Sequence, residues 1–192
     1  MEKMGYSGTK DYKWLDACNS LKWTEITAHG IDFNNKTVVD IGCQSGLTCL
    51  RAWNSGAKDV QGFDVRGKII DVCNKSLDTY NNKDGVTFEV DDLIMNPPPA
   101  DIVFCMGLVH YFNDDEYIHI LRSLCQAAKQ HLIIEWRVSV TDTGSPVRRG
   151  AQTLASTTWG TRLITGYGFS ICKYVIQVKD HERREMWICT KG

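Results

Sequence analysis

The sequence lacks several features that would assign it at once to a well-marked class of protein. Its formal net charge is -1 over 192 residues, so no basic excess indicates a polyphosphate partner such as DNA. No apolar run approaches the roughly 20 residues that a membrane helix needs. Residues 1–15 contain no apolar stretch followed by a small-residue cleavage site, as a signal peptide would. We therefore expect a cytoplasmic protein with no membrane partner.

Paired cysteine motifs are also missing, although the chain contains 8 cysteines. Without a Cys-x-x-Cys pair, zinc ribbons and thioredoxin-type redox sites have no support, and we expect no metal site. The cysteines lie mostly one at a time inside apolar segments, where a free thiol behaves as a small buried hydrophobe. This pattern predicts a reduced, intracellular protein without disulfides.

Short apolar runs alternate with segments of helical periodicity along most of the chain. The sequence contains no internal repeat. β-branched or continuously apolar runs predict strands at 37–41, 59–65, 86–90, 101–106 and 131–136. Helical spacing predicts helices at 47–54, 69–80 and 114–128. This alternation is typical of βαβ units that form a parallel sheet covered on both faces.

The C-terminal part departs from this alternation. We expect a polar loop at 139–150, a helix at 155–167, and strands at 169–178 and 185–190 joined by a charged turn. The predicted fold is therefore α/β: a doubly wound, mostly parallel seven-stranded sheet with helices on both faces and a C-terminal antiparallel hairpin. Residues 1–35 are interpreted as a helical lead-in or lid, and 36–192 as a single domain.

The run TVVDIGCQSG, residues 37–46, places two glycines directly after the first predicted strand. In open parallel sheets, ligands bind outside the carboxyl ends of the strands, next to such a turn. The spacing of Gly42 and Gly46 does not match the G-x-G-x-x-G of dinucleotide sites, which disfavours a nicotinamide enzyme. Asp40 at the strand end favours a cationic ligand group, such as an ammonium. The structural alternative is a turn with a capping acid.

Two later strands end in acids as well. Asp64 ends the second strand, where a carboxylate usually binds ribose hydroxyls; the alternative is a surface acid at a strand end. Asp91 and Asp92 follow the third strand, where one could accept from an exocyclic amine and the other could cap a turn. An ammonium, a ribose and an adenine amine together describe S-adenosylmethionine.

The segments VVDIGCQSG, GFDV, VDDL and ADIVFCMGLVHYF resemble four ordered motifs of the class I S-adenosylmethionine-dependent methyltransferases, and GYGF resembles the entry to their last two strands. The resemblance spans about residues 36–191, with Gln44 in place of the family's central glycine. Local likeness in 31–46, 104–112 and 132–136 is to enzymes that modify the wobble uridine of transfer RNA. The cofactor-binding residues that the resemblance implies are Asp40, Gly42, Cys43, Gly46, Asp64, Val65, Asp91, Asp92, Leu93, Cys105 and Met106.

The resemblance implies that the segment after the fourth strand lies beside the methyl group and the acceptor. His110 and Tyr111 are the candidate catalytic residues there, with His110 removing a proton from the acceptor. Alternatively, His110 bonds a loop carbonyl and Tyr111 packs on the next helix. MGLV stands where methyltransferases of nucleobase amines carry Asn/Asp-Pro-Pro-aromatic, so a flipped-base amine is disfavoured. We expect a small-molecule acceptor more than RNA or protein.

The sequence is also compatible with further roles for charged residues and with a different class of function. Glu135, at the end of the fifth strand, could act as a base, but an ion pair with Arg137 or Arg148 is the preferred interpretation. Transfer of a carboxymethyl group from a modified cofactor would need a cation near the methyl position, for which Arg51, Arg137 and Arg148 are candidates. The chain could also be a non-catalytic cofactor-binding subunit. A homo-oligomer or a partner subunit could complete the acceptor site.

Overall fold

The computed structural model describes residues 20–78, 84–139, 147–149, 152–154, 156–179 and 182–192. The chain divides into two compact units, 1–32 and 33–192. The described part of the first unit is a helix over 20–28 followed by a turn. Most of the predicted lead-in lies outside the described residues, so its role as a lid stays a prediction.

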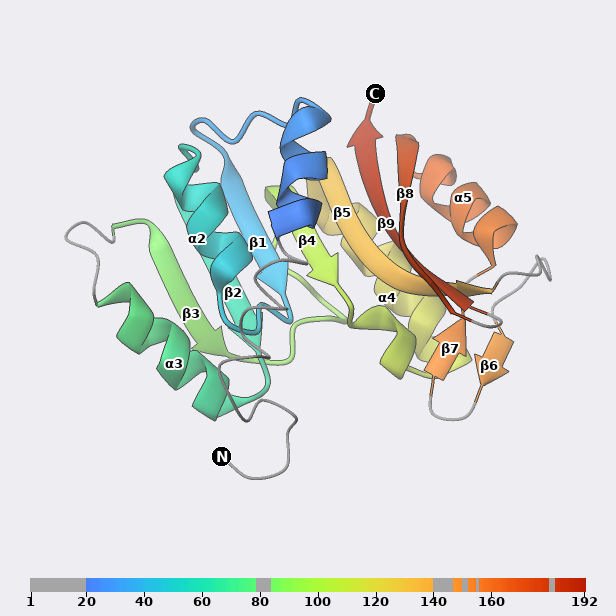
Figure 1. The fold of residues 1–192 in the computed structure, drawn as a ribbon, viewed down its shortest axis with the longest axis horizontal. Coiled ribbons are helices and arrows are strands. Elements are labelled where there is room, and N and C mark those ends of the chain that lie inside the picture. The colour runs from blue at the N-terminus through green and yellow to red at the C-terminus, as the bar shows by residue number, and fades with distance from the viewer. Residues whose placement is uncertain (1–19, 79–83, 140–146, 150–151, 155, 180–181) are drawn as a thin grey trace. The chain divides into compact units, whose positions relative to one another are not determined.

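The second unit is built on a seven-stranded sheet with the order β3-β2-β1-β4-β5-β9-β8 (Figure 1). Strands β1 to β5 are parallel to one another, whereas β9 runs antiparallel to both β5 and β8. The chain order reverses between β1 and β4, which makes this the switch point where ligands bind. The strands are β1 Thr37–Ile41, β2 Asp59–Asp64, β3 Val86–Val90, β4 Ala100–Met106, β5 Ala128–Ser139, β8 Phe169–Lys179 and β9 Glu182–Lys191.

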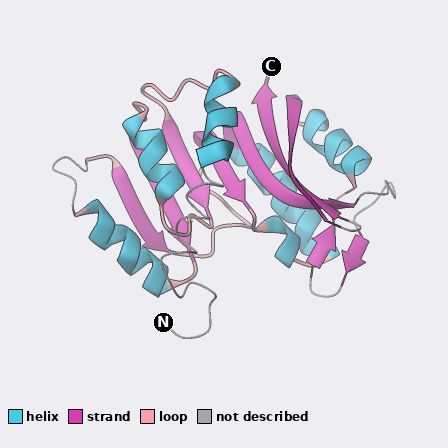
Figure 2. Ribbon diagram, in the orientation of Figure 1, coloured by secondary structure: helices cyan, strands magenta, loops and turns pink. Residues whose placement is uncertain are grey.

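Helices cover both faces of this sheet (Figures 1 and 2). On one face, α2 and α3 follow β1 and β2, and a thiol of α2 contacts a carboxylate of β1. On the other face, α4 and α5 enclose a continuous apolar cluster with β1, β4, β5 and β9. The helices are α2 Leu47–Asn54, α3 Gly67–Leu77, α4 Asp114–Ala127 and α5 Thr157–Gly166, with a 3-10 turn η1 at Val109–Tyr111. The predicted fold class is confirmed.

Local sequence explains how α4 is fixed against the sheet. Asn113 accepts from the backbone of Glu116 at 3.0 Å, and the Glu116 carboxylate accepts from Asn113 at 3.2 Å. This capping box satisfies the first donors of the helix. The helix then buries Tyr117, whose ring stacks on Trp136 of β5 with centroids 6.2 Å apart. The cap therefore fixes the residue at which α4 begins.

The described cysteines are all free thiols, and Cys18 lies outside the described residues. Within the same residues, no helix is long and apolar enough to cross a membrane, and no group of His, Cys, Asp or Glu is placed to hold a metal.

The predicted loop at 139–150 is wrong in part. Strand β5 extends to Ser139, and β6 Val147–Arg149 pairs antiparallel with β7 Gln152–Leu154. Strands of three residues are too short to carry a readable alternation of apolar and polar side chains. Helix α4 also runs into β5 without a loop, because Ala127 ends the one and Ala128 begins the other.

Candidate functional site

The turn after β1 is tied to the end of β2. Gly42 and Cys43 both donate backbone hydrogen bonds to the carbonyl of Phe63, at 2.8 and 2.9 Å. Gly46 has a φ of 70 and precedes the first residue of α2, so the chain reverses sharply at the N-terminus of that helix. Gln44 also adopts a positive φ, 47. The residue that replaces the family's central glycine therefore keeps a left-handed backbone. For a residue with a Cβ, this conformation is less favourable by about 1 kcal/mol or more.

Asp40 lies beneath this turn and is 3% exposed. The thiol of Cys49 lies 3.7 Å from its carboxylate. Burial, together with the negative charge of Asp64, raises the pKa of Asp40 to about 7. A buried carboxyl group of this kind is stabilised in its ionised form by a cation brought in from outside. The chemistry of Asp40 thus suits the cationic ligand that the sequence predicted.

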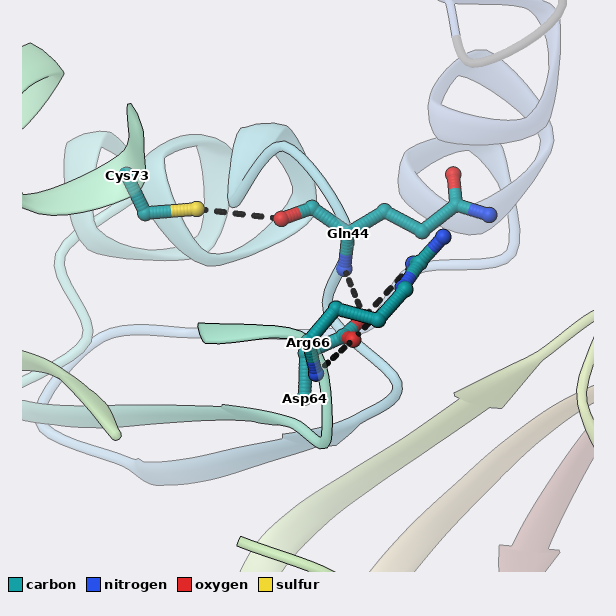
Figure 3. Close-up of polar contacts among 4 residues, drawn as sticks. All are labelled: Gln44, Asp64, Arg66 and Cys73. Carbon is teal, nitrogen blue, oxygen red and sulfur yellow. Dashed lines mark hydrogen bonds and ion pairs between the residues drawn. The ribbon is translucent and has the colours of Figure 1, made fainter. Parts of the chain in front are cut away.

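Asp64 ends β2, but its carboxylate is already occupied (Figure 3). One oxygen accepts from the backbone N–H and the Nε of Arg66 at 3.0 and 2.8 Å. The other accepts from Arg66 Nη2 at 2.8 Å and from the backbone of Gln44 at 3.2 Å. Burial acts to raise the pKa of Asp64, but the bonds from Arg66 outweigh it and hold the pKa below its ordinary value. A ribose would have to replace the Arg66 side chain.

The predicted residues after β2 and β3 are mostly open to solvent. Val65 is 61% exposed, and Asp91 and Asp92 are both exposed. Asp91 accepts from the backbone N–H of the next residue, Asp92, at 2.7 Å. Leu93 is partly buried against the apolar cluster. Since β2 and β3 are parallel to β1, these residues follow the same edge of the sheet as the glycine turn.

S-Adenosylmethionine fits the residues present at this edge. Asp40 offers a buried anion to the positive charge of the cofactor, the N-terminus of α2 follows the glycine turn, and Asp64 provides two carboxylate oxygens at the end of β2 once Arg66 is displaced. These groups stand at the carboxyl ends of adjacent strands, where the fold places its ligands.

At the end of β4, the side chain of Cys105 is fully buried in the cluster under α4, so only its backbone can contact a ligand. Met106 is half-buried. Gly107 has a φ of 73 and donates from its N–H to the carbonyl of Glu135 at 2.9 Å. A Cβ added to Gly107 would lie 3.1 Å from Nη2 of Arg184. A guanidinium group of β9 therefore lies directly over the residue that follows β4.

His110 is fully buried in η1, and neither ring nitrogen has a hydrogen-bond partner among the described residues. The alternative interpretation, in which His110 bonds a loop carbonyl, is therefore not supported by the described residues. Burial, together with the positive charges of Arg137 and Arg184, lowers the pKa of His110 to about 3. Tyr111 is 58% exposed and its ring lies 4.4 Å from that of His110. A histidine with this pKa is neutral but a weak base, unless a negative charge comes close.

Glu135 is 1% exposed and forms an ion pair with Arg184, with 2.8 Å between the carboxylate oxygen and Nε. The sequence pointed to Arg137 or Arg148 as its partner, and the Arg148 side chain lies outside what is described.

Arg51 is in the last turn of α2, away from the helix N-terminus at the glycine turn. Arg184 and Arg66 were both missed. The antiparallel register of the C-terminal hairpin against β5 is the signal that could have indicated Arg184.

Comparisons with known proteins agree with this geometry. Residues 38–131 match the family described as "Methyltransferase domain". The chain is 30% identical over 119 residues to the tRNA U34 carboxymethyltransferase of Wolinella succinogenes, covering 59% of this chain and 39% of that protein. It is 29% identical over 83 residues to the ribosomal protein L11 methyltransferase of Shewanella halifaxensis, covering 43% and 26%. The chain thus spans well under half the length of these curated relatives.

Solved structures show the same fold. The magnesium protoporphyrin IX methyltransferase of Synechocystis PCC 6803, with bound SAM, superposes with a TM-score of 0.69 at 16% identity, covering 92% of this chain and 79% of that chain. An S-adenosylmethionine-dependent methyltransferase of Mesorhizobium loti gives a TM-score of 0.66 at 16% identity, covering 88% and 97%.

The fold is the Rossmann-like fold of S-adenosylmethionine-dependent methyltransferases, as the sequence motifs predicted. Residues 38–131 thus carry a methyltransferase domain, and the comparisons support S-adenosylmethionine, the predicted cofactor.

Proposed function

We propose that this chain transfers a methyl group from S-adenosylmethionine to a small-molecule acceptor. The observation that carries the proposal is Asp40, a buried carboxyl group with a raised pKa, placed under a glycine turn at the switch point of the sheet. Such a group favours a ligand that is itself a cation. The sulfonium cofactor supplies the reactive methyl group, and the protein supplies position and electrostatics.

The side chains have separate roles in this proposal. Asp40 binds the positive charge, Asp64 binds the ribose after Arg66 moves, and the turn at Gly42 and Gly46 directs the chain into the N-terminus of α2. Met106 and Gly107 form the floor of the transfer position at the end of β4. His110 and Tyr111 face the acceptor side. An acceptor must lie in line with the breaking bond at near-attack distance.

Several observations support a small acceptor over RNA or protein. The polar groups beyond β4, His110 and Glu135, are fully or almost fully buried, which suits a molecule that can enter between the strands and η1. The net charge of -1 provides no general attraction for phosphates. Relatives named as acting on tRNA and on a ribosomal protein are similar over less than two thirds of this chain, and RNA or protein acceptors stay the alternatives to a small molecule.

The proposal is tested by isothermal calorimetry with S-adenosylmethionine, S-adenosylhomocysteine and NAD. We expect binding of the first two with micromolar affinity, no binding of NAD, and loss of binding in Asp40→Ala. The matched control is Asp71→Ala, which removes an exposed acid from α3 and should bind like the wild type. Equal binding by both variants would overturn the role of Asp40, and no binding of either cofactor form by the wild type would overturn the cofactor assignment.

A non-catalytic cofactor-binding subunit is the second candidate, and the low pKa of His110, about 3, favours it, because the candidate base is then weak. An acceptor screen that follows formation of S-adenosylhomocysteine separates the two functions, because an enzyme turns the cofactor over and a binding subunit does not. Binding without turnover, alone or with a partner chain, would favour the second.

A further inference from the structure

Three free thiols gather around the glycine turn that follows β1, although they come from three different parts of the chain. Cys43 lies in the turn itself, Cys49 in α2 and Cys73 in α3. All three side chains are buried. The thiol of Cys49 lies against Asp40, 3.7 Å from its carboxylate. The thiols of Cys43 and Cys73 have no part in the proposed methyl transfer.

Cys73 reaches the turn from α3 (Figure 3). Its thiol donates to the carbonyl oxygen of Gln44 at 3.0 Å, and Gln44 is the residue directly after Cys43. A Cβ built on Gly46 would lie 3.3 Å from the Cys73 sulfur. The sulfur atom of this helix therefore packs against both halves of the turn.

The side chains of Cys43 and Cys73 also hydrogen-bond to each other. The two sulfur atoms therefore face each other, and a change of side-chain torsions brings them toward the S–S bond length of about 2 Å. The two residues are 30 positions apart in the sequence. A disulfide between them would cross-link the glycine turn to α3.

The two thiols differ in a way that suits oxidation. The hydrogen bond from Cys43 lowers the pKa of Cys73 below its ordinary value. The same bond, together with burial, raises the pKa of Cys43. The thiolate is the form that reacts with oxidants, and a neighbouring thiol then converts the product to a disulfide. Cys73 is therefore the attacking group, and Cys43 is the thiol that resolves the product.

We propose that Cys43 and Cys73 form a redox-active dithiol at the cofactor turn, which hydrogen peroxide converts to a disulfide. The thiolate of Cys73 attacks the peroxide, breaks its O–O bond and becomes a sulfenic acid, with release of hydroxide. The thiol of Cys43 then attacks the Cys73 sulfur, so that the S–S bond forms and the sulfenic oxygen leaves as water. The hydroxide takes up the proton that Cys73 lost, so the two thiols are oxidised and the peroxide is reduced to water.

Peroxide is the oxidant that suits this position because of its size. Cys43 is 6% exposed and Cys73 is 1% exposed, so a bulky disulfide reagent has little access to either sulfur. Hydrogen peroxide is hardly larger than water and reaches such a site through small openings of the chain.

The disulfide would change the cofactor site. Cys43 donates its N–H to the carbonyl of Phe63 at 2.9 Å, and its own carbonyl accepts from Gly46 at 2.9 Å, so a shift of Cys43 moves the whole turn. Oxidation also removes the S–H that Cys73 donates to Gln44. We expect the oxidised protein to bind S-adenosylmethionine more weakly. This consequence rests on the proposed function, because it takes the turn to be the cofactor site.

Peptide mapping by mass spectrometry tests whether the disulfide forms. Reduced wild-type protein is treated with hydrogen peroxide, the excess is removed with catalase, and the remaining thiols are alkylated in denaturant before digestion. Trypsin leaves Cys43 and Cys49 together on residues 37–51 and places Cys73 on residues 69–75. We expect these two peptides to be linked, with the alkyl label on Cys49, and to separate after dithiothreitol. A sulfinic acid on Cys73, or a different cysteine pair, as the main product would overturn the proposal.

Calorimetry with S-adenosylhomocysteine then measures the consequence. Affinity should be at least about 10-fold weaker after peroxide treatment and return with dithiothreitol. Cys73→Ser keeps a donor for Gln44 but cannot form the disulfide, so its affinity should be the same before and after peroxide. Cys172→Ser removes a half-buried thiol of β8 and should lose affinity like the wild type. An equal loss in Cys73→Ser, or no loss in wild type that carries the disulfide, would overturn the effect on the cofactor site.

Failure of the proposed function gives a different result. If the reduced protein does not bind S-adenosylhomocysteine, the proposed function fails, and peptide mapping still decides whether the dithiol is oxidised. Where it binds, the coupling is reciprocal. Saturating S-adenosylhomocysteine should then shift the ratio of dithiol to disulfide, in a buffer of reduced and oxidised dithiothreitol, by the factor by which the disulfide weakens binding. An unchanged ratio would overturn the coupling.

Discussion

The guanidinium group of Arg66 holds the carboxylate of Asp64 by two side-chain contacts of 2.8 Å, only two residues apart in the chain (Figure 3). Asp64 is 4% exposed, whereas the Arg66 side chain is 31% exposed. The acid is therefore fixed at the end of β2, and the arginine can turn toward solvent. The Arg66 side chain thus occupies the position predicted for the ribose.

This relationship predicts that removing Arg66 helps the cofactor to bind. A half-exposed ion pair contributes about 0–1 kcal/mol, so Arg66→Ala should bind S-adenosylmethionine up to about 5-fold more tightly. Calorimetry measures the effect directly. Lys68→Ala, which removes an exposed cation from the first turn of α3, should leave the affinity unchanged. Weaker binding by Arg66→Ala would mean that the arginine contacts the cofactor and is not its competitor.

Asp40 predicts a pH dependence of cofactor binding. Its pKa is raised to about 7, so below pH 7 the carboxyl group must lose a proton before it can bind a cation. Affinity should fall by up to about tenfold for each pH unit below 7 and level off near pH 8. Binding near pH 6.5 should release a proton, which calorimetry detects as a dependence on the ionisation enthalpy of the buffer.

Asp40→Asn is the control for this prediction. It keeps the shape of the side chain but cannot ionise, so the pH dependence and the proton release should both disappear, along with most of the affinity. A wild-type affinity that stays constant between about pH 5.5 and 8 would contradict the assigned role of Asp40.

The packing of α5 predicts an effect on stability that is independent of function. A Cβ on Gly160 would lie 2.8 Å from Cη2 of Trp136 and 3.2 Å from Cη2 of Trp187. Both rings are fully buried and meet edge to face with centroids 4.5 Å apart, so neither can move cheaply. Gly160→Ala should reduce the free energy of unfolding by about 1–3 kcal/mol, measured by urea denaturation.

Gly166 offers the matched comparison on the same helix. A Cβ there meets nothing within 4 Å, and alanine favours helix more than glycine does. Gly166→Ala should leave stability unchanged or raise it by up to about 1 kcal/mol. If both variants lost stability equally, the close approach of α5 to the tryptophans would not be the cause.

Much of the site could be predicted because it depends on local order along the chain. The strand that ends at Ile41, the glycine turn and the helix that begins at Leu47 follow one another within a single βα unit, and the structure has them at the predicted bounds. The last residues of all the parallel strands also lie at the same edge of the sheet. Asp40 and Asp64 could thus be placed before any tertiary contact was known.

The acceptor side depends on contacts between distant strands, and these could not be predicted. Glu135 and Arg184 are 49 positions apart in the sequence, and they meet because β9 inserts between β5 and β8 in an exact antiparallel register. A shift of one residue would send Arg184 to the opposite face. The burial of His110 likewise depends on how η1 packs against the rest of the protein. The sequence does not indicate this burial, because the adjacent Tyr111 is exposed.

His110 gives the last prediction, which concerns stability at low pH. Its pKa is lowered to about 3, whereas in the unfolded chain it is near 6.5. Below pH 6.5 the unfolded chain therefore binds a proton that the folded protein does not, and stability falls as the pH decreases toward 3. Between pH 7 and 5 this amounts to roughly 2 kcal/mol. His110→Gln should lose about that much less stability than the wild type over this interval, measured by urea denaturation at each pH. His119→Gln, which alters an exposed histidine of α4, should follow the wild-type curve, and parallel curves for all three proteins would show that His110 takes up its proton without unfolding.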